Sequence, residues 1–212
     1  MSHQEADRGF FLVFEGGEGG GKSTQSRLVA DWLEAEGRTV TRTRQPGGTD
    51  VGARLREILL DPATGSLDPR AEALVYAADK AEHVATLLAP ALKRGEVVVC
   101  DRYVDSTLAY QGAGRAVDPG ELAQLSAWAT RGLRPDLTVV LDVDPLVGLG
   151  RAGDHDRIES EPLDFHQRVR GRFLALAAER PEAYLVVDAD RDPQAVHAEV
   201  REAVAARIEA HR

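Results

Sequence analysis

Cysteine and lysine are scarce in this chain of 212 residues. The one cysteine, Cys100, excludes an internal disulfide and a cysteine metal cage, which fits a reducing compartment, and we expect the cytoplasm. Because Cys100 ends an apolar run, we expect its thiol to be buried. Of the 26 basic residues, only Lys22, Lys80 and Lys93 are lysine. Against this arginine bias, Lys22 indicates a position where a compact ammonium group suits better than a planar guanidinium group.

Long apolar runs and a surplus of positive charge are also absent. No stretch approaches the roughly 18 apolar residues of a membrane helix, and no signal peptide is recognisable, so we expect no membrane partner. The net charge of -9 argues against nucleic acid as the main ligand, although small anions need only a local cluster of cations. The length suits one domain, which we place at residues 9–212 after a disordered tail over residues 1–8.

Short apolar runs alternate with longer helical patterns along the whole chain. The longest helical pattern predicts one helix over residues 70–94. Strands are predicted at residues 10–14, 38–43, 97–100, 137–142 and 184–188. Apolar strands in such alternation are typical of a parallel sheet with helices on both faces. Ligands of such sheets bind at the carboxyl ends of the strands, where Glu15, Arg44 and Asp101 lie.

A glycine-rich stretch links the first predicted strand to the first predicted helix. Gly16-x4-Gly21-Lys22-Ser23 has the spacing of a phosphate-binding loop, and a glycine-rich turn without a ligand would not need the lysine and serine in this register. Glycines let backbone N–H groups turn toward a phosphate, and the following helix points its positive end there. Lys22 would bind the β- and γ-phosphates. The predicted ATP-binding residues here are Gly16, Gly17, Glu18, Gly19, Gly20, Gly21, Lys22, Ser23 and Thr24.

Asp101 follows a buried strand and has the position of a carboxylate that holds Mg²⁺ directly or through water, together with the Ser23 hydroxyl. The alternative roles are a helix cap or an ion pair with Arg102. A phosphate loop alone does not separate an ATPase, a switch GTPase and a kinase, but the guanine-reading pattern Asn-Lys-x-Asp is absent. The predicted fold class is α/β: a P-loop three-layer sandwich with a five-stranded parallel sheet, helices on both faces and a short lid.

Four segments closely resemble bacterial thymidylate kinases, which belong to the P-loop nucleoside monophosphate kinases. They are FEGGEG at 14–19, TRQPGGT at 43–49, DRYVDSTLAYQG at 101–112 and RPDLTVVLDV at 134–143, with DRIE at 156–159 as a weaker fifth. The resemblance implies phosphoryl transfer from ATP to dTMP, giving dTDP and ADP for dTTP synthesis, with Mg²⁺ and a homodimer. The alternatives are another nucleoside or nucleotide kinase, or a regulatory P-loop ATPase, which would leave the TRQPGGT and YQG segments without a role.

The resemblance also implies roles for single residues. Arg102 would hold the dTMP phosphate, Glu15 would orient the sugar or the metal shell, and Tyr76 would stack on thymine. Tyr110 would pack against the deoxyribose, while Arg56, Ser106, Thr107 and Gln111 would read the base edge. The implied dTMP-binding residues are Glu15, Arg44, Pro46, Arg56, Tyr76, Lys80, Arg102, Ser106, Thr107, Tyr110 and Gln111. Because the acceptor is already a phosphate, positioning and charge cancellation supply the catalysis.

Three features depart from the family pattern. Lys80 stands where the family usually has arginine, and Gln45 where many bacterial members have glutamate, so we expect weaker dTMP affinity. The third is the lid, RAGDHDR at 151–157, which is short and poor in basic residues. Since the phosphate loop offers no arginine, we expect Arg151 to reach the transferring phosphoryl group and Arg157 to close on ATP, with His155 as an outside candidate. The predicted catalytic residues are Lys22, Arg102, Arg151 and Glu15.

Overall fold

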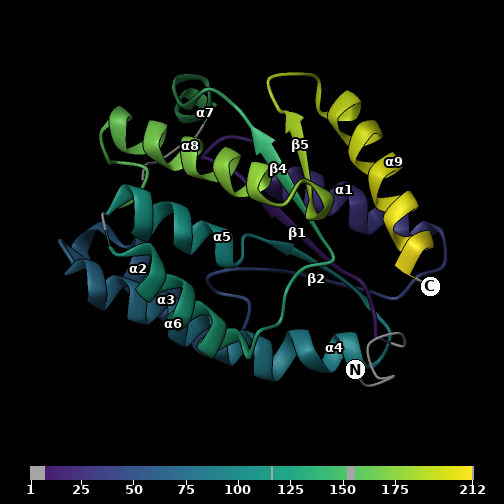
Figure 1. Cartoon of the computed structure of the whole chain (residues 1–212), viewed down its shortest axis with the longest axis horizontal. Coiled ribbons are helices and arrows are strands. Elements are labelled where there is room, and N and C mark those ends of the chain that lie inside the picture. The colour runs from purple at the N-terminus through teal and green to yellow at the C-terminus, as the bar shows by residue number, and fades with distance from the viewer. Residues whose placement is uncertain (1–7, 116, 152–155, 212) are drawn as a thin grey trace.

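The computed structural model describes residues 8–115, 117–151 and 156–211, and within them a five-stranded sheet forms the centre of the fold (Figure 1). Its strands are β1 (Phe11–Glu15), β2 (Val40–Arg44), β3 (Val97–Asp101), β4 (Leu137–Asp142) and β5 (Tyr184–Asp188). Their order is β2-β3-β1-β4-β5, and every neighbouring pair is parallel. Asp101 pairs in register with Phe14 of β1 and with Arg44 of β2, so the predicted site residues meet at one edge. The predicted fold class is confirmed.

Helices cover both faces of this sheet (Figure 1). One face carries α1 and α9, and the other carries α4 and α8. Further helices, α2, α3 and α6, pack on one another beside the second face. The helices are α1 (Lys22–Ala35), α2 (Asp50–Leu60), α3 (Pro69–His83), α4 (Ala89–Lys93), α5 (Val104–Thr107), α6 (Pro119–Thr130), α7 (Pro145–Arg151), α8 (Leu163–Glu179) and α9 (Pro193–His211).

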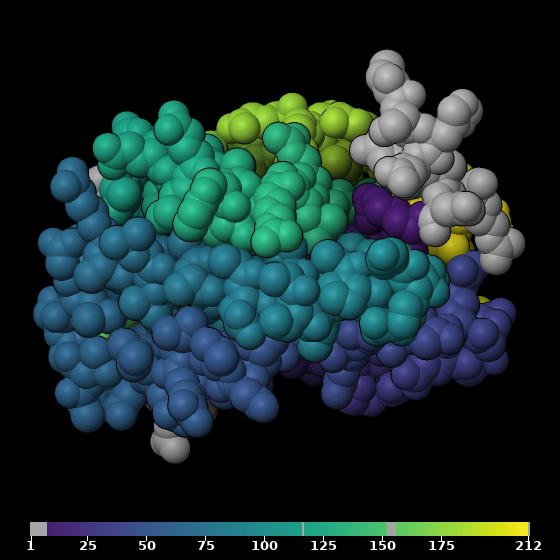
Figure 2. All heavy atoms as spheres, turned by 90° about the horizontal axis from the view of Figure 1, so that it is seen from below, coloured from purple at the N-terminus to yellow at the C-terminus, as the bar shows by residue number. Residues whose placement is uncertain are grey.

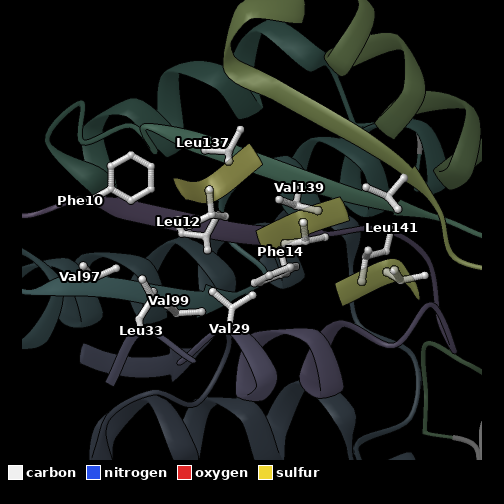
Figure 3. Packing of buried hydrophobic residues seen from close by; sticks show 14 of the residues in the cluster. Phe10, Leu12, Phe14, Val29, Leu33, Val97, Val99, Leu137, Val139 and Leu141 are labelled. Carbon is white, nitrogen blue, oxygen red and sulfur yellow. The ribbon is translucent and has the colours of Figure 1, made fainter. Parts of the chain in front are cut away.

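The alternation of side chains along β1 divides the core into two sides. Phe10, Leu12 and Phe14 face α1 and α9, where Val29 and Leu33 pack on them (Figure 3). Phe11 and Val13 face the opposite layer. Since β1 is buried on both sides, every residue of the strand is apolar until Glu15, the first position at the ligand edge. The core therefore fixes where β1 ends and where the phosphate loop begins.

Two helical segments differ from the sequence prediction. The single helix predicted over residues 70–94 is present as one continuous helical stretch, but it contains an unpredicted π-helical segment, Val84–Leu88, between α3 and α4. Pro90 in the first turn of α4 explains the change, since proline has no N–H group and its ring clashes with a carbonyl one turn earlier. Residues 104–114, for which no helix was predicted, form α5 and a second π-helical segment, Leu108–Gly114. Such segments are frequent at functional sites.

The amino-terminal end of the described chain packs on the domain. Arg8 forms an ion pair with Asp136, with 2.6 Å between Nη2 and Oδ1, and the backbone N–H of Gly9 donates to the carbonyl of Leu92. The rest of the predicted disordered tail, residues 1–7, lies outside the described residues. Among the helices that the structure does describe, none is both long and apolar enough to cross a membrane.

Candidate active site

A cavity of about 470 Å³ opens at the carboxyl edge of the sheet. It is lined by residues from the phosphate loop, the segment after β2, helix α3, the segment after β3 and the end of α7. Most of the predicted site residues are among them: Glu18, Gly19, Gly21, Lys22, Ser23, Thr24, Arg44, Pro46, Arg56, Tyr76, Lys80, Asp101, Arg102, Ser106, Thr107, Tyr110, Gln111 and Arg151. The predicted donor and acceptor residues thus share one cavity. Glu15 and Gly16 lie directly behind them, each hydrogen-bonded to residues of the lining.

The phosphate loop is held in shape by its glycines and by a close contact with α7. Gly21 has a left-handed φ of 81° and is the N-cap of α1, which exposes the first N–H groups of the helix. Gly19 (φ 64°) touches α7 so closely that a Cβ atom there would lie 2.0 Å from the carbonyl oxygen of Gly148. Side chains are therefore excluded on the α7 side of the loop.

Lys22 and Ser23 begin α1 inside the cavity. The Lys22 ammonium group donates to the carbonyl of Gly17. Burial, followed by the charge of Arg102, lowers the pKa of Lys22 to about 8, although nearby carboxylates oppose this shift. The Ser23 hydroxyl donates to Asp101 Oδ2 over 2.6 Å. A hydroxyl and a carboxylate oxygen placed this close are suitable ligands for a hard cation such as Mg²⁺.

Glu18 and Arg102 form an ion pair across the cavity, which the sequence did not predict. Arg102 Nη2 lies 2.8 Å from both carboxylate oxygens of Glu18, and the Tyr110 hydroxyl donates to the same carboxylate over 2.6 Å. Burial opposes ionisation of Glu18, but the charges of Arg102 and Lys22 and the Tyr110 hydrogen bond lower its pKa to about 2. The guanidinium group also donates to the carbonyl of Gly16. Arg102 is therefore fixed over the phosphate loop.

Glu15 anchors the segment that follows β3. Its Oε1 accepts hydrogen bonds from the backbone N–H groups of Tyr103 and Ser106, and its Oε2 accepts from the Ser106 hydroxyl. Burial, with a further contribution from the charge of Asp105, raises the pKa of Glu15 to about 7. The carboxyl group thus has the geometry of a positioning group that holds the start of α5 against the sheet.

Three arginines, Arg44, Arg56 and Arg102, bring positive charge together in the cavity. Arg56 donates to the carbonyl of Pro46, and its pKa is lowered by burial and by the neighbouring charges of Arg44 and Arg102. Three guanidinium groups that repel one another are a suitable site for a bound anion. Arg56 thus lies in a cationic group, whereas the sequence had assigned it to the base edge.

Lys80 and Tyr76 lie deeper in the cavity. The Lys80 ammonium group is 5.4 Å from the centre of the Tyr76 ring, and the side chain is almost completely buried. Burial lowers the pKa of Lys80, an effect that the charge of Asp79 opposes. Thr107, also buried, lines the cavity with a hydroxyl group that has no hydrogen-bond partner among the described residues. These groups are arranged to contact a flat ligand with polar edges.

His83 does not line the cavity but contacts Gln45, which does, and the sequence gave no signal for this contact. Its ring is buried, with Nδ1 2.8 Å from the amide nitrogen of Gln45 and Nε2 2.8 Å from the hydroxyl of Thr43. Burial, followed by the charge of Lys80, lowers the pKa of His83 to about 4, so the ring is neutral at pH 7. His83 thereby holds the loop after β2. Its spacing in the sequence does not distinguish it from the other histidines.

The lid arginines differ in their surroundings. Arg151 lines the cavity, and its guanidinium group binds Asp190 and the carbonyl of Ala189. Arg157 is not part of the lining. It forms an ion pair with Glu72 and donates to the carbonyl of Leu59. This geometry does not support the expectation that Arg157 closes on ATP. His155 lies outside the described residues.

Known proteins resemble this chain over most of its length. A family model described as thymidylate kinase matches residues 14–200. A thymidylate kinase of Leifsonia xyli subsp. xyli is 56% identical over 197 residues, covering 91% of this chain and 93% of that protein. One of Cutibacterium acnes is 54% identical over 196 residues, covering 92% and 96%. The crystal structure of thymidylate kinase from Ehrlichia chaffeensis superimposes with a TM-score of 0.78 at 34% identity, covering 92% and 98% of the two chains.

Proposed function

The chain belongs to the thymidylate kinase family, and from this premise we propose how its own residues phosphorylate dTMP. It is an enzyme that transfers a phosphoryl group from ATP to dTMP in dTTP synthesis. The observation that carries the assignment of residues is the single cavity, in which Lys22 of the phosphate loop and Gln111 of the acceptor side both take part. We assign the phosphate-loop residues to ATP. We assign to dTMP the implied acceptor residues that lie between Arg44 and Gln111 in the sequence.

Lys22 and Arg102 neutralise the transferring group from two sides. Lys22 is held at the loop by the Gly17 carbonyl, and a bound triphosphate would bring negative charge that raises its lowered pKa again. Arg102 contacts the loop through Gly16 and turns toward the acceptor side through Ser106. Since both cations are fixed by protein groups before the substrates bind, little reorganisation accompanies phosphoryl transfer.

Arg44, Arg56 and Arg102 bind the phosphate of dTMP in this proposal. Their mutual repulsion, expressed in the lowered pKa of Arg56, is relieved by a dianionic ligand. Tyr76 stacks on the base, and Thr107 and Gln111 meet its polar edge. Glu15 acts behind them by holding Ser106 and the start of α5.

Ser23 and Asp101 are the residues we propose for Mg²⁺. In the described residues no group of three or more histidine, cysteine, aspartate or glutamate side chains could hold a metal ion. The pair of oxygen ligands therefore fits an ion whose remaining ligands are phosphate oxygens and water, which is usual for Mg²⁺. When bound, such an ion would neutralise part of the charge on the β- and γ-phosphates.

Arg151 is the lid residue we propose for the transferring phosphoryl group. It is the lid arginine that lines the cavity in the described part of the chain. To reach the phosphates its guanidinium group must leave Asp190, a partly exposed ion pair of the kind that contributes little to stability. Arg151 would then have two alternative partners: Asp190 in the free enzyme and the phosphates in the substrate complex.

We also propose a homodimer that works in the cytoplasm. Exposed hydrophobic side chains gather on three helices that pack on one another: Val51 and Ile58 on α2, Leu74 on α3 and Trp128 on α6. Figure 2 shows part of this surface, with α3, α4 and α6 side by side. Apolar side chains on adjacent helices favour a partner surface, and a second copy of the chain would bury them. The free, buried Cys100 supports a reducing compartment.

The proposal is tested by measuring ADP release from ATP and Mg²⁺ with dTMP, dUMP, dCMP, dGMP, UMP and thymidine supplied separately. Strong stimulation by dTMP is expected. Preference for another acceptor would mean that Lys80 and Gln45 have altered the base site. Turnover that ignores every acceptor would contradict the kinase function and favour a regulatory ATPase.

A further inference from the structure

Glu72 of α3 lies behind the base-reading side of the cavity and is not part of its lining. Only 1% of the residue is exposed. Its carboxylate binds three side chains that come from separate segments. Oε1 accepts from the amide nitrogen of Gln111 over 2.9 Å and from Arg115 over 3.4 Å, and Oε2 pairs with Arg157. The sequence gave no reason to single out this residue.

The contact with Glu72 determines which way the Gln111 amide points. A carboxylate can only accept hydrogen bonds, so the NH₂ group of Gln111 must face Glu72. This identifies the two ends of the amide by chemistry. In the described part of the chain, this is the one side-chain hydrogen bond of Gln111, a residue that lines the cavity. Its carbonyl oxygen is therefore free to accept from a ligand.

A fixed acceptor distinguishes pyrimidine bases. Thymine and uracil carry a hydrogen on ring nitrogen N3, whereas the N3 of cytosine carries a lone pair and can only accept. We propose that Glu72 is a positioning residue that holds Gln111 with its oxygen toward the acceptor base, and so selects bases with an N3–H group over cytosine. This inference rests on the proposed function and names a source of its acceptor specificity.

Two arginines keep the Glu72 carboxylate in place. Arg157 also donates from Nε to the carbonyl of Leu59 over 2.8 Å, and Arg115 pairs with Glu161 over 2.5 Å. Without such partners, the charged form of a buried carboxyl group would be strongly disfavoured. With both arginines bound, Glu72 stays a carboxylate and offers Gln111 only acceptor oxygens. Arg157, which the sequence had assigned to ATP, thereby contributes to the dTMP side of the site. The segment that ends the lid is tied to the base-reading residues.

The test is the ratio of kcat/KM for dTMP to that for dCMP in Glu72→Gln. A glutamine at this position can accept or donate, so the Gln111 amide is free to turn its NH₂ group toward the base. The ratio should fall about tenfold, the effect of one hydrogen bond. The matched control is Glu161→Gln, which also takes a carboxylate from Arg115 but does not touch Gln111. Its ratio should stay at the wild-type value.

A double-mutant cycle with Gln111→Ala separates positioning from general damage. Adding Glu72→Gln to Gln111→Ala should not change the ratio further, because the amide is already gone. Should Glu72→Gln unfold, Glu72→Asp keeps the negative charge but shortens the side chain by one methylene group, which weakens the hydrogen bond to Gln111, and its ratio should also fall. A folded variant that loses activity equally with dTMP and dCMP would overturn the inference. A wild-type protein that fails to phosphorylate dTMP would instead overturn the proposed function.

Discussion

Gly148 and Gly150 lie two residues apart in α7, but only Gly148 touches the phosphate loop. A Cβ atom on Gly148 would lie 2.2 Å from the carbonyl oxygen of Glu18, whereas one on Gly150 would have no neighbour within 4 Å. Cβ atoms essentially never approach another atom closer than 3.0 Å, so Gly148→Ala must separate α7 from the loop by about 0.8 Å. The obstacle is backbone, which cannot turn aside as a side chain could.

The two alanine variants should therefore change activity and stability differently. Alanine favours the helix by up to about 1 kcal/mol over glycine at either position, so Gly150→Ala should be slightly more stable than the wild type. In Gly148→Ala the clash opposes that gain. A shift of about 1 Å in groups that position a reacting phosphate can lower the rate by roughly 100-fold. We expect a loss of this size in kcat/KM for ATP with Gly148→Ala and little loss with Gly150→Ala.

Initial rates of ADP formation at saturating dTMP, with ATP varied, measure the effect on the loop. Urea denaturation of both variants measures the effect on stability. If Gly148→Ala turns over within a factor of three of Gly150→Ala and unfolds at the same urea concentration, the close approach of α7 to the phosphate loop does not control catalysis. A loss in stability without a loss in turnover would contradict the reasoning as well.

Other predictions concern the lid, the helical surface and pH. Arg151→Ala should lower kcat by about 10³-fold or more if this arginine reaches the transition state, and turnover within a few-fold of wild type would remove it from that role. If the proposed homodimer forms, Trp128→Glu should convert it to a monomer in light-scattering measurements, and a monomeric wild type would refute the proposal. Because the pKa of Glu15 is raised from an ordinary value of 4.5 to about 7, the folded protein keeps a proton that the unfolded chain releases. Stability should therefore fall as pH rises from 4.5 through 7, and Glu15→Gln should remove that fall; equal pH slopes for the two proteins would contradict it.

The sheet and the phosphate loop were predictable because their signals are local. A strand buried on both faces must be apolar along its length, and a loop that wraps a phosphate needs its glycines, Lys22 and Ser23 at fixed spacing. Each signal lies within about fifteen residues of sequence. The family resemblance then placed the acceptor residues, of which Arg102 and Gln111 line the cavity as expected.

The charge pairs of the site were not predictable, because they join segments far apart in the chain. Glu18 meets Arg102 across 84 residues, and Glu72 meets Arg157 across 85. Sequence position indicates that an arginine is present at the lid but not which carboxylate it meets. For Arg157 the nearest strong partner is the buried Glu72, and a buried carboxylate binds an arginine more strongly than solvent-exposed groups do. Tertiary packing thus decided its role.

The same kind of contact explains why Gln45 can replace a glutamate in this chain. The amide nitrogen of Gln45 can only donate, so Nδ1 of His83 accepts and Nε2 carries the proton toward Thr43. A glutamate at position 45 would instead pair with the other neutral tautomer of His83, in which Nδ1 carries the proton and Nε2 accepts from the Thr43 hydroxyl. Gln45 thus pairs with a neutral His83 and holds the loop after β2 in place without a negative charge at position 45. On these grounds Gln45 need not weaken dTMP binding, and the expected loss of affinity falls on Lys80 alone.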